Sequence, residues 1–367
     1  MKDFFLRHKK LHIWLLADGG VLLAYFLLRG NRGLMNALAD HVTGPFRRGI
    51  GQVSYLFPFS VMEAVYVLAA LFAAGYLVWN AAAVAKARGR RRERAYQAVL
   101  GAACGLLTVW AVFCLLWGVN FWTDSFQDES GIYARPVALE DLRAVTEYFA
   151  ARTAETAGTV ERDEHGLFAV PREEILADAV RAYDGVTEDF PFLAFDDPGV
   201  KPMAFSRLMS AMDFTGFYCA YTGESNVNVD SPACMLPATI AHELAHQRGY
   251  ASEQECNFLG VLAATTSGLP AYVYSGWLLG YVYLGNALYS QDPEAYWAIR
   301  ETVPEEARLD LAYNNAYWAP YQDTVVQQAS NKIYDGILKS YGEERGIQSY
   351  GTVVDLLVVY YRDLDTL

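Results

Sequence analysis

Three long apolar stretches occupy the first third of the chain, over residues 11–28, 58–85 and 98–119. One charge interrupts each of the first two, Asp18 and Glu63, and none interrupts the third. A bilayer core about 30 Å thick is spanned by about 20 apolar residues in a helix, and each stretch reaches or approaches that length. The pattern predicts a membrane anchor, residues 1–119, with three transmembrane helices in contact with membrane lipid. Because of Asp18 the first stretch could instead be a buried soluble helix, while the lack of a small-residue cleavage pattern disfavours a signal peptide.

The distribution of charge orients these predicted spans. Residues 1–119 carry 14 Lys and Arg against 5 Asp and Glu, whereas residues 120–367 carry 15 against 37. With three spans, ten basic residues fall on one side of the membrane: Lys2, Arg7, Lys9, Lys10, Lys86, Arg88, Arg90, Arg91, Arg92 and Arg94. Positive charge stays cytoplasmic, so we expect a multi-pass protein of the cell membrane with a cytoplasmic N-terminus and an extracytoplasmic domain over residues 120–367. This acidic domain is unsuited to nucleic acid, whose phosphates need basic surface.

The second part of the chain combines helical periodicity with one short strand pattern. Residues 138–154 and 172–183 place apolar residues at helical spacing among charges. Residues 222–230 alternate between apolar and polar, which predicts a short, half-exposed strand. From residue 256 to residue 291 no charge occurs, so we expect buried helices broken at residues 268–270, with a fourth span as the alternative. The predicted fold is therefore α+β and predominantly helical, with three N-terminal transmembrane helices followed by a domain that contains a small sheet.

One helix of this domain is predicted with both of its ends marked. Pro237 suits a first helical turn, and Gly249 suits the position just after the last turn. Between them lie His242, Glu243 and His246, in the spacing His-Glu-x-x-His. Residues four apart project from one helical face, so both imidazoles can reach one tetrahedral Zn2+. Glu243, about 100° round the helix, can take a proton from the attacking water and pass it to the leaving amine. Two helix histidines without a metal are the alternative.

The helix that follows offers the third ligand. It is predicted to begin at Ser252, where Glu255 three residues later completes a capping box. That gives Glu255 a structural task and leaves Glu253, in the first turn, as the predicted ligand, with Glu255 as the alternative. Asn257, four residues after Glu253 on the same face, could orient a ligand through a hydrogen bond. Two His and one Glu leave one position of a single Zn2+ open for water, which is typical of a catalytic zinc.

Other residues are candidates for binding substrate and for stabilising the reacting carbonyl oxygen. Asn226 and Asn228 lie on the predicted strand, whose edge could pair with a peptide substrate. Arg248, directly after the zinc-binding motif, is a further candidate for substrate binding. An oxyanion stabiliser is also expected. Tyr218, Tyr221 and Arg248 are the candidates for that role.

Several motifs together resemble a known family. They fall at residues 201–202, 205–206, 215–218, 221–228, 242–249, 346–351 and 354–357. On these motifs the chain resembles DUF3810, a family of bacterial membrane proteins of unknown function that is similar to zinc peptidases. It departs from the family pattern at Cys256, where Ala is expected, and at Ala220-Tyr221, where Pro often precedes Thr-Gly-Glu. The pair Glu253 and Asn257 also looks like the Glu-x-x-x-Asp/Asn helix of gluzincin peptidases, which implies zinc binding by Glu253.

These observations predict a membrane-anchored zinc metallopeptidase that hydrolyses peptide bonds in a peptide or protein substrate of the cell envelope. A zinc-binding sensor or scaffold without turnover is one alternative, disfavoured because a purely structural zinc has no use for Glu243. An intramembrane protease is the other. It is disfavoured because the residues flanking the zinc helix include Asp230 and Arg248, and such groups are costly in hydrocarbon.

Overall fold

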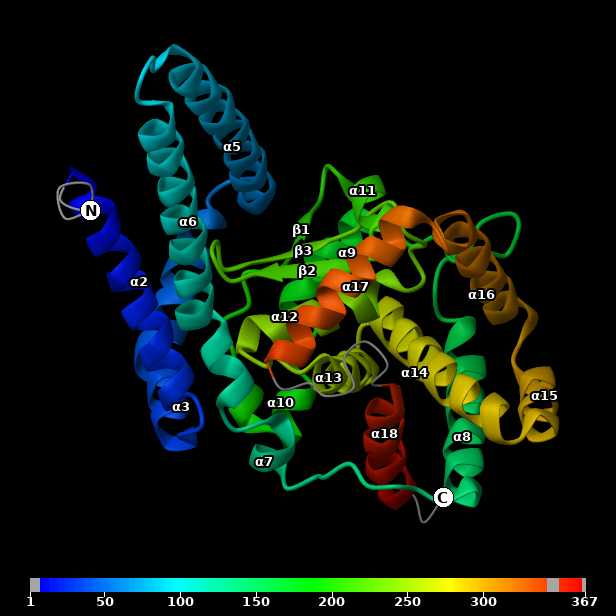
Figure 1. Ribbon diagram of the computed structural model, residues 1–367. Helices are drawn as coiled ribbons and strands as arrows, with labels where there is room; N and C mark the ends of the chain where they lie inside the picture. Colours follow the sequence, from blue (N-terminus) through cyan, green and yellow to red (C-terminus); the bar gives the residue numbers. More distant parts are fainter. Residues whose placement is uncertain (1–6, 342–349, 365–367) are drawn as a thin grey trace. The chain divides into compact units, whose positions relative to one another are not determined.

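The computed structural model describes residues 7–341 and 350–364, and the chain forms two compact units (Figure 1). The first unit comprises Met1–Gly51, Val61–Thr123 and Ala220–Thr222. The second comprises Gln52–Ser60, Asp124–Cys219 and Gly223–Leu367. The main change of unit follows Thr123, close to the predicted boundary at residue 119, but the short segment 52–60 also belongs to the second unit. The predicted family motif at residues 346–351 lies largely outside the described residues.

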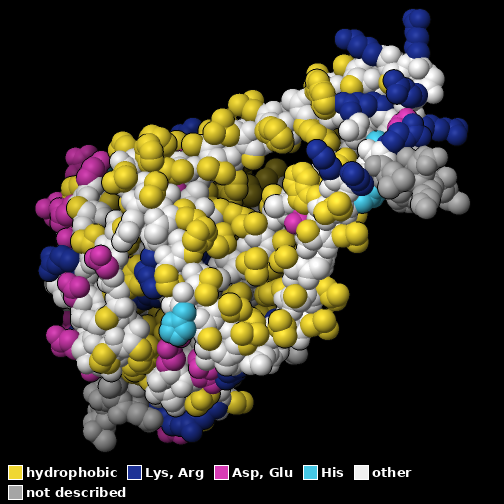
Figure 2. All heavy atoms as spheres, turned by 90° about the vertical axis from the view of Figure 1, so that its left-hand side faces the viewer, with side chains coloured by type: hydrophobic (Ala, Val, Ile, Leu, Met, Phe, Trp, Pro, Cys, Tyr) yellow, Lys and Arg dark blue, Asp and Glu magenta, His cyan; other side chains and the backbone are white. Residues whose placement is uncertain are grey.

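Three helices of the first unit are long and apolar enough to cross a membrane: α2 (Lys9–Leu28), α5 (Val61–Lys86) and α6 (Arg91–Leu116). They coincide with the three predicted stretches, although α6 begins seven residues earlier than its apolar run. Large apolar side chains remain exposed along them, such as Leu16, Phe72 and Leu106 at 72%, 75% and 72%. Figure 2 shows this apolar surface, with Lys and Arg side chains gathered at one end of the helices.

The charge inside the first apolar helix has partners on its neighbour. α2 packs along α6. Thr108 of α6 donates a hydrogen bond to Asp18 Oδ2 over 2.7 Å, and Trp14 Nε1 donates to the same Thr108 hydroxyl over 2.9 Å. Asp18 therefore does not prevent this segment from being a long apolar helix. The rest of the unit is made of short elements: α3 (Arg32–Leu38), the π-helix η1 (Ala39–Thr43), most of α4 (Gly44–Ser54) and the 3-10 helix η2 (Gly118–Trp122).

The second unit is built mainly of helices around one hydrophobic core. Its α-helices are α7 (Phe126–Ser130), α8 (Leu139–Ala157), α9 (Arg172–Asp178), α10 (Val186–Asp189), α11 (Ser206–Ala211), α12 (Leu236–Arg248), α13 (Glu253–Thr266), α14 (Pro270–Gln291), α15 (Pro293–Thr302), α16 (Glu305–Trp318), α17 (Val325–Ser340) and α18 (Tyr350–Leu364). The 3-10 helices are η3 (Ala179–Arg181), η4 (Pro191–Leu193) and η5 (Ala319–Tyr321). α14 packs against α8, α12, α13 and α18, and it buries Tyr272, Tyr274 and Leu278 completely.

The uncharged run from residue 256 to residue 291 forms α13 and α14, with a break at residues 267–269. Most of its apolar side chains are buried in the core, which confirms the prediction of buried helices. Among the described residues α14 is not one of the helices that could cross a membrane. The predicted helix at residues 138–154 is α8, and the one at residues 172–183 is shorter, ending in η3.

A three-stranded sheet lies beside α12 and has the order β1-β3-β2. β1 (Lys201–Pro202) is parallel to β3 (Glu224–Val227), and β2 (Gly216–Cys219) is antiparallel to it. The prediction of a half-exposed strand here is wrong, because all four residues of β3 are buried. Its polar side chains have internal partners instead, as when the Ser225 hydroxyl donates to the Glu243 carbonyl oxygen over 3.0 Å.

A buried ion pair ties the segment Gln52–Ser60 to this sheet. Lys201 Nζ on β1 lies 2.5 Å from Glu224 Oε1 on β3, and the two side chains are only 6% and 0% exposed. The same ammonium donates hydrogen bonds to the carbonyl oxygens of Ser54, over 2.6 Å, and Phe59, over 2.9 Å. All three ammonium protons thus have acceptors, as a buried Lys requires.

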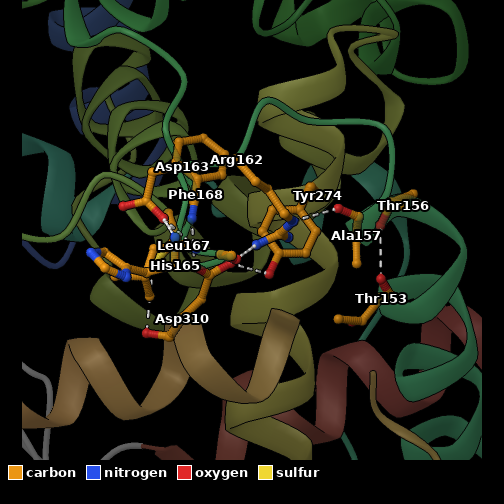
Figure 3. Close-up of polar contacts among 12 residues, drawn as sticks. Thr153, Thr156, Ala157, Arg162, Asp163, His165, Leu167, Phe168, Tyr274 and Asp310 are labelled. Carbon is orange, nitrogen blue, oxygen red and sulfur yellow. Dashed lines mark hydrogen bonds and ion pairs between the residues drawn. The ribbon is translucent and has the colours of Figure 1, made fainter. Parts of the chain in front are cut away.

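A second buried charge joins α14, α16 and the loop after α8 (Figure 3). Asp310 on α16 pairs with Arg162 over 3.1 Å and accepts a hydrogen bond from the Phe168 amide over 2.8 Å. The hydroxyl of Tyr274 also donates a hydrogen bond to Asp310, at Oδ2, over 2.5 Å. Each oxygen of the buried carboxylate is therefore satisfied by donors from other segments, which fixes α16 to the core.

Candidate metal centre

α12 presents the predicted His-Glu-x-x-His residues with the expected helix ends. Pro237 lies in its first turn, and Gly249 follows it with a left-handed φ of 113°. A side chain is strained at such a φ, so Gly249 lets the chain leave the helix and turn toward α13. The helix spacing places the rings of His242 and His246 edge to face, with their centroids 4.9 Å apart.

The carboxylate of Glu253 meets both imidazoles. Glu253 Oε2 lies 3.3 Å from His242 Nε2, and Glu253 Oε1 lies 3.4 Å from His246 Nε2. Ligand atoms about 2.1 Å from a tetrahedral zinc ion lie about 3.4 Å from one another, so these spacings fit a zinc ion. One ligand atom from each of the three residues lies within 4.8 Å of the others, and these residues could hold a metal ion.

His246 is held in the orientation that a metal ligand needs. Its Nδ1 donates to the Tyr250 carbonyl oxygen over 2.8 Å, and the Cys256 sulfur lies 3.3 Å from the same nitrogen. When the ring is neutral with its proton on Nδ1, its Nε2 lone pair faces the site, and such bonds to outer groups fix metal-binding histidines. Cys256, at which the chain departs from the family pattern, therefore contacts a proposed ligand. The sequence did not indicate this contact.

The acid and base of this cluster shift each other's ionisation. Burial alone would lower the pKa of His246, but Cys256 and the Glu253 carboxylate outweigh it and raise that pKa well above its ordinary value. Burial would raise the pKa of Glu253, but the imidazoles of His246 and His242 hold it well below its ordinary value. Without a metal the cluster therefore holds an ionised Glu253 beside a protonated His246.

Glu243 lies next to these ligands and is almost completely buried. Burial raises the pKa of its carboxyl to about 7, and only the charges of His242 and His246 oppose this rise. Its Oε2 atom is buried and has no hydrogen-bond partner among the described residues. β2 passes directly over the carboxyl group, since a Cβ added at Gly216 would lie 2.3 Å from Glu243 Oε1. The arrangement suits a carboxylate that exchanges a proton with a small molecule at the ligand cluster.

A tyrosine that the sequence did not single out also reaches the cluster. The hydroxyl of Tyr334, on α17, donates a hydrogen bond to Glu253 Oε1. Its ring packs edge to face on Phe214, with the ring centroids 5.4 Å apart. Tyr334 is 81 residues from Glu253 in the chain, and no local motif links the two.

Glu255 is held away from the histidines by a different structural task from the predicted one. The capping box is wrong, because the Ser252 side chain makes no capping bond. Glu255 instead accepts hydrogen bonds from the amides of Phe126, over 3.1 Å, and Gln127, over 3.3 Å, at the start of α7. Asn257 accepts a bond from the Tyr283 hydroxyl over 3.0 Å, rather than orienting a proposed ligand.

The residues predicted to bind substrate are buried and have internal partners. The predicted edge pairing by the strand of Asn226 and Asn228 is wrong, because β3 is the central strand and β2 is an outer one. Asn228 Nδ2 donates to the Ser210 hydroxyl over 2.8 Å. The guanidinium of Arg248 pairs with Asp197 over 2.5 Å and is 4% exposed, which gives it a structural task, and its substrate contact stays a prediction. A buried Arg–carboxylate pair is a structural clamp.

Two tyrosines were predicted as oxyanion stabilisers. Tyr218 lies on β2 opposite Ser225 and is buried. Tyr221 belongs to the first unit, where its hydroxyl donates to the Val109 carbonyl oxygen over 3.0 Å.

The fold and site define a predominantly helical protein with three candidate membrane helices and a His-His-Glu cluster that could hold a metal ion. The chain belongs to the family described as "Protein of unknown function (DUF3810)", which it matches over residues 42–358. The match includes α5, α6 and the whole ligand cluster, whereas α2 precedes it. No curated protein and no solved structure matches the chain.

Proposed function

We propose that the protein is a membrane-anchored metallopeptidase that binds one Zn2+ through His242, His246 and Glu253. The observation that carries this proposal is the 3.3 Å and 3.4 Å spacing of the Glu253 oxygens from the two imidazole nitrogens, with a buried carboxyl beside them. Imidazole and carboxylate suit zinc, and three protein ligands leave a fourth position for water or substrate, as in catalytic zinc sites.

The residues would divide the work of amide hydrolysis. When bound, the zinc ion would polarise the substrate carbonyl and lower the pKa of water to about 7. Glu243 takes a proton from the attacking water while the water oxygen bonds to the carbonyl carbon. The same proton then passes to the nitrogen as the C–N bond breaks, leaving a carboxylic acid, whose remaining proton is then lost to solvent, and an amine. Without a metal the pKa of the Glu243 carboxyl is about 7, and a cation bound beside it would lower that pKa, so Glu243 would be ionised and able to accept the proton at neutral pH.

The sheet supports a peptide as the substrate class. β2 is an outer strand of the sheet, and its residue Gly216 lies against the Glu243 carboxyl. An extended peptide that added to an outer strand would bring its own carbonyl groups past the base. The three apolar helices and the basic residues at their ends favour a cytoplasmic N-terminus and a catalytic unit on the outer side, with substrates in the cell envelope.

The test is zinc binding and peptide cleavage by the full-length protein in detergent, with and without Glu243→Gln. We expect about one zinc per chain in both, and cleavage of generic peptides that falls by at least about 1000-fold in the variant, a loss typical of an essential acid–base residue. Glu305→Gln, an exposed residue on α16, is the matched control and should cleave like the wild type. Equal zinc content with no cleavage by any of the three proteins would instead favour a zinc-binding sensor or scaffold.

A further inference from the structure

α17 is attached to the second unit by its polar face. Gln327 and Asn331, one turn apart, each donate a hydrogen bond to Asp213 Oδ2 over 3.0 Å. Tyr334 and the buried Leu338 continue the same face of the helix. The other face exposes apolar side chains: Val325, Val326, Ile333 and Ile337. The inward face of α17 is therefore attached by hydrogen bonds as well as by the buried Leu338.

Tyr334 points its hydroxyl from this face at the ligand cluster. It donates to Glu253 Oε1, the oxygen that lies 3.4 Å from His246 Nε2. The phenol oxygen thus shares the small space in which the three ligand atoms converge. Its ring is fixed by the edge-to-face contact with Phe214, so the hydroxyl is held in place rather than left to rotate into solvent.

Two other tyrosine hydroxyls of this unit have partners elsewhere. The hydroxyl of Tyr183 donates to the Ala241 carbonyl oxygen over 2.9 Å, and that of Tyr250 donates to Glu129 over 2.5 Å. Tyr334 instead donates to a proposed metal ligand. A neutral phenol keeps its proton at neutral pH and can donate one strong hydrogen bond to an anionic oxygen.

We propose that Tyr334 is a catalytic residue that stabilises the transition state of amide hydrolysis. Its hydroxyl would donate to the substrate carbonyl oxygen as that oxygen gains negative charge, and Glu253 would accept the bond when no substrate is present. This role rests on the proposed hydrolase function. It assigns to a distant helix the oxyanion stabiliser that Tyr218 and Tyr221 were predicted to supply. Tyr334 keeps its proton throughout, so the proton balance between water, Glu243 and the leaving amine is unchanged.

The test compares full-length, zinc-loaded wild type with Tyr334→Phe, which keeps the ring on Phe214 and removes only the hydroxyl. Because a fixed donor at a developing oxyanion contributes about 100- to 1000-fold to turnover, we expect kcat to fall by about that factor with KM changed less than about 3-fold. The zinc dissociation constant should also stay within about 3-fold. Tyr313→Phe, which alters an exposed tyrosine on α16, is the matched control and should match the wild type.

A second readout does not depend on turnover. A dipeptide phosphonate carries a tetrahedral anionic group that resembles the transition state. Calorimetry should show that Tyr334→Phe binds it about 10- to 100-fold more weakly than the wild type does. Equal phosphonate affinity in the two proteins, or no binding to zinc-loaded wild type, would overturn the role of Tyr334. So would a loss of turnover that excess zinc restores, because Tyr334 would then only position Glu253.

The two readouts also separate this inference from the proposed function. Absence of cleavage by the wild type contradicts the hydrolase. The phosphonate comparison still decides whether the Tyr334 hydroxyl donates a hydrogen bond to an anionic oxygen at the cluster. Cleavage by the wild type that Tyr334→Phe leaves unchanged contradicts the inference alone.

Discussion

β2 leaves no room for a side chain beside the proposed base, Glu243. A Cβ added at Gly216 would lie 2.3 Å from Oε1, 2.5 Å from Cγ and 2.6 Å from Cδ of Glu243. Non-bonded carbon atoms prefer separations of about 3.5–4.0 Å, so Gly216→Ala must push the carboxyl away by about 1 Å. β2 cannot easily give way instead, because its pairing with β3 sets Gly216 opposite Val227.

This displacement converts into an expected loss of turnover. A shift of about 1 Å in a reacting group can cost about 100-fold in rate, so we expect kcat of Gly216→Ala to fall by about that factor. Overpacking should also lower the free energy of unfolding by about 1–3 kcal/mol. The three atoms nearest to the added Cβ all belong to Glu243, and none belongs to a proposed zinc ligand. The zinc content should therefore stay at about one per chain.

The assay measures kcat and zinc content for Gly216→Ala and for a control, Gly158→Ala. A Cβ at Gly158, just after α8, meets nothing within 4 Å, so this control should behave like the wild type. Unchanged kcat in Gly216→Ala would refute the placement of Glu243 as the base beneath β2. Loss of zinc together with activity would show that the strand supports the ligands rather than the base.

Two further predictions concern other buried charges. Lys201→Met leaves the fully buried Glu224 carboxylate without its cation and should lower the free energy of unfolding by about 3–5 kcal/mol in denaturant titrations; Lys201→Met with Glu224→Leu should recover most of that loss, and equal losses in both would contradict it. Zinc binding should release a proton, because His246 is protonated in the metal-free protein until pH rises through its raised pKa. The Glu253–His246 pair stabilises that metal-free state fully between the ordinary pKa of Glu, about 4.3, and that of His, about 6.5, and progressively less outside this range. Calorimetry in buffers of different ionisation enthalpy measures the released proton, which should disappear at alkaline pH; release that is independent of pH would contradict this charge state.

The parts of the fold that the sequence predicted well depend on local patterns. The three long apolar helices can be predicted from length and composition alone, and Pro237 and Gly249 mark the ends of α12. Glu253, the predicted third ligand, does lie beside both histidines, but the reasoning through a capping box was wrong. Glu255 is buried against α7, 128 residues away, a contact that no local pattern signals.

The strand was predicted with the wrong environment because polarity was taken to mean exposure. Asn226 and Asn228 are fully buried, with hydrogen bonds inside the fold. A polar side chain can be buried at low cost once its groups have partners, and some of those partners, such as Ser210 for Asn228, come from other segments of the chain. For the same reason the roles of Lys201 and Arg248 could not be predicted from their neighbours in the chain.

This difference between local and distant contacts separates binding from turnover in the proposed site. Two ligands and the base lie on one helix and the third ligand lies at the start of the next, so their mutual geometry follows from sequence spacing. The strand that bounds Glu243 and the helix that carries Tyr334 are brought in by tertiary packing. Substitutions of the proposed ligands His242, His246 and Glu253 should therefore change zinc affinity and turnover together. Substitutions on β2 and α17 should change turnover while zinc stays bound, because the groups they move face the substrate rather than the metal.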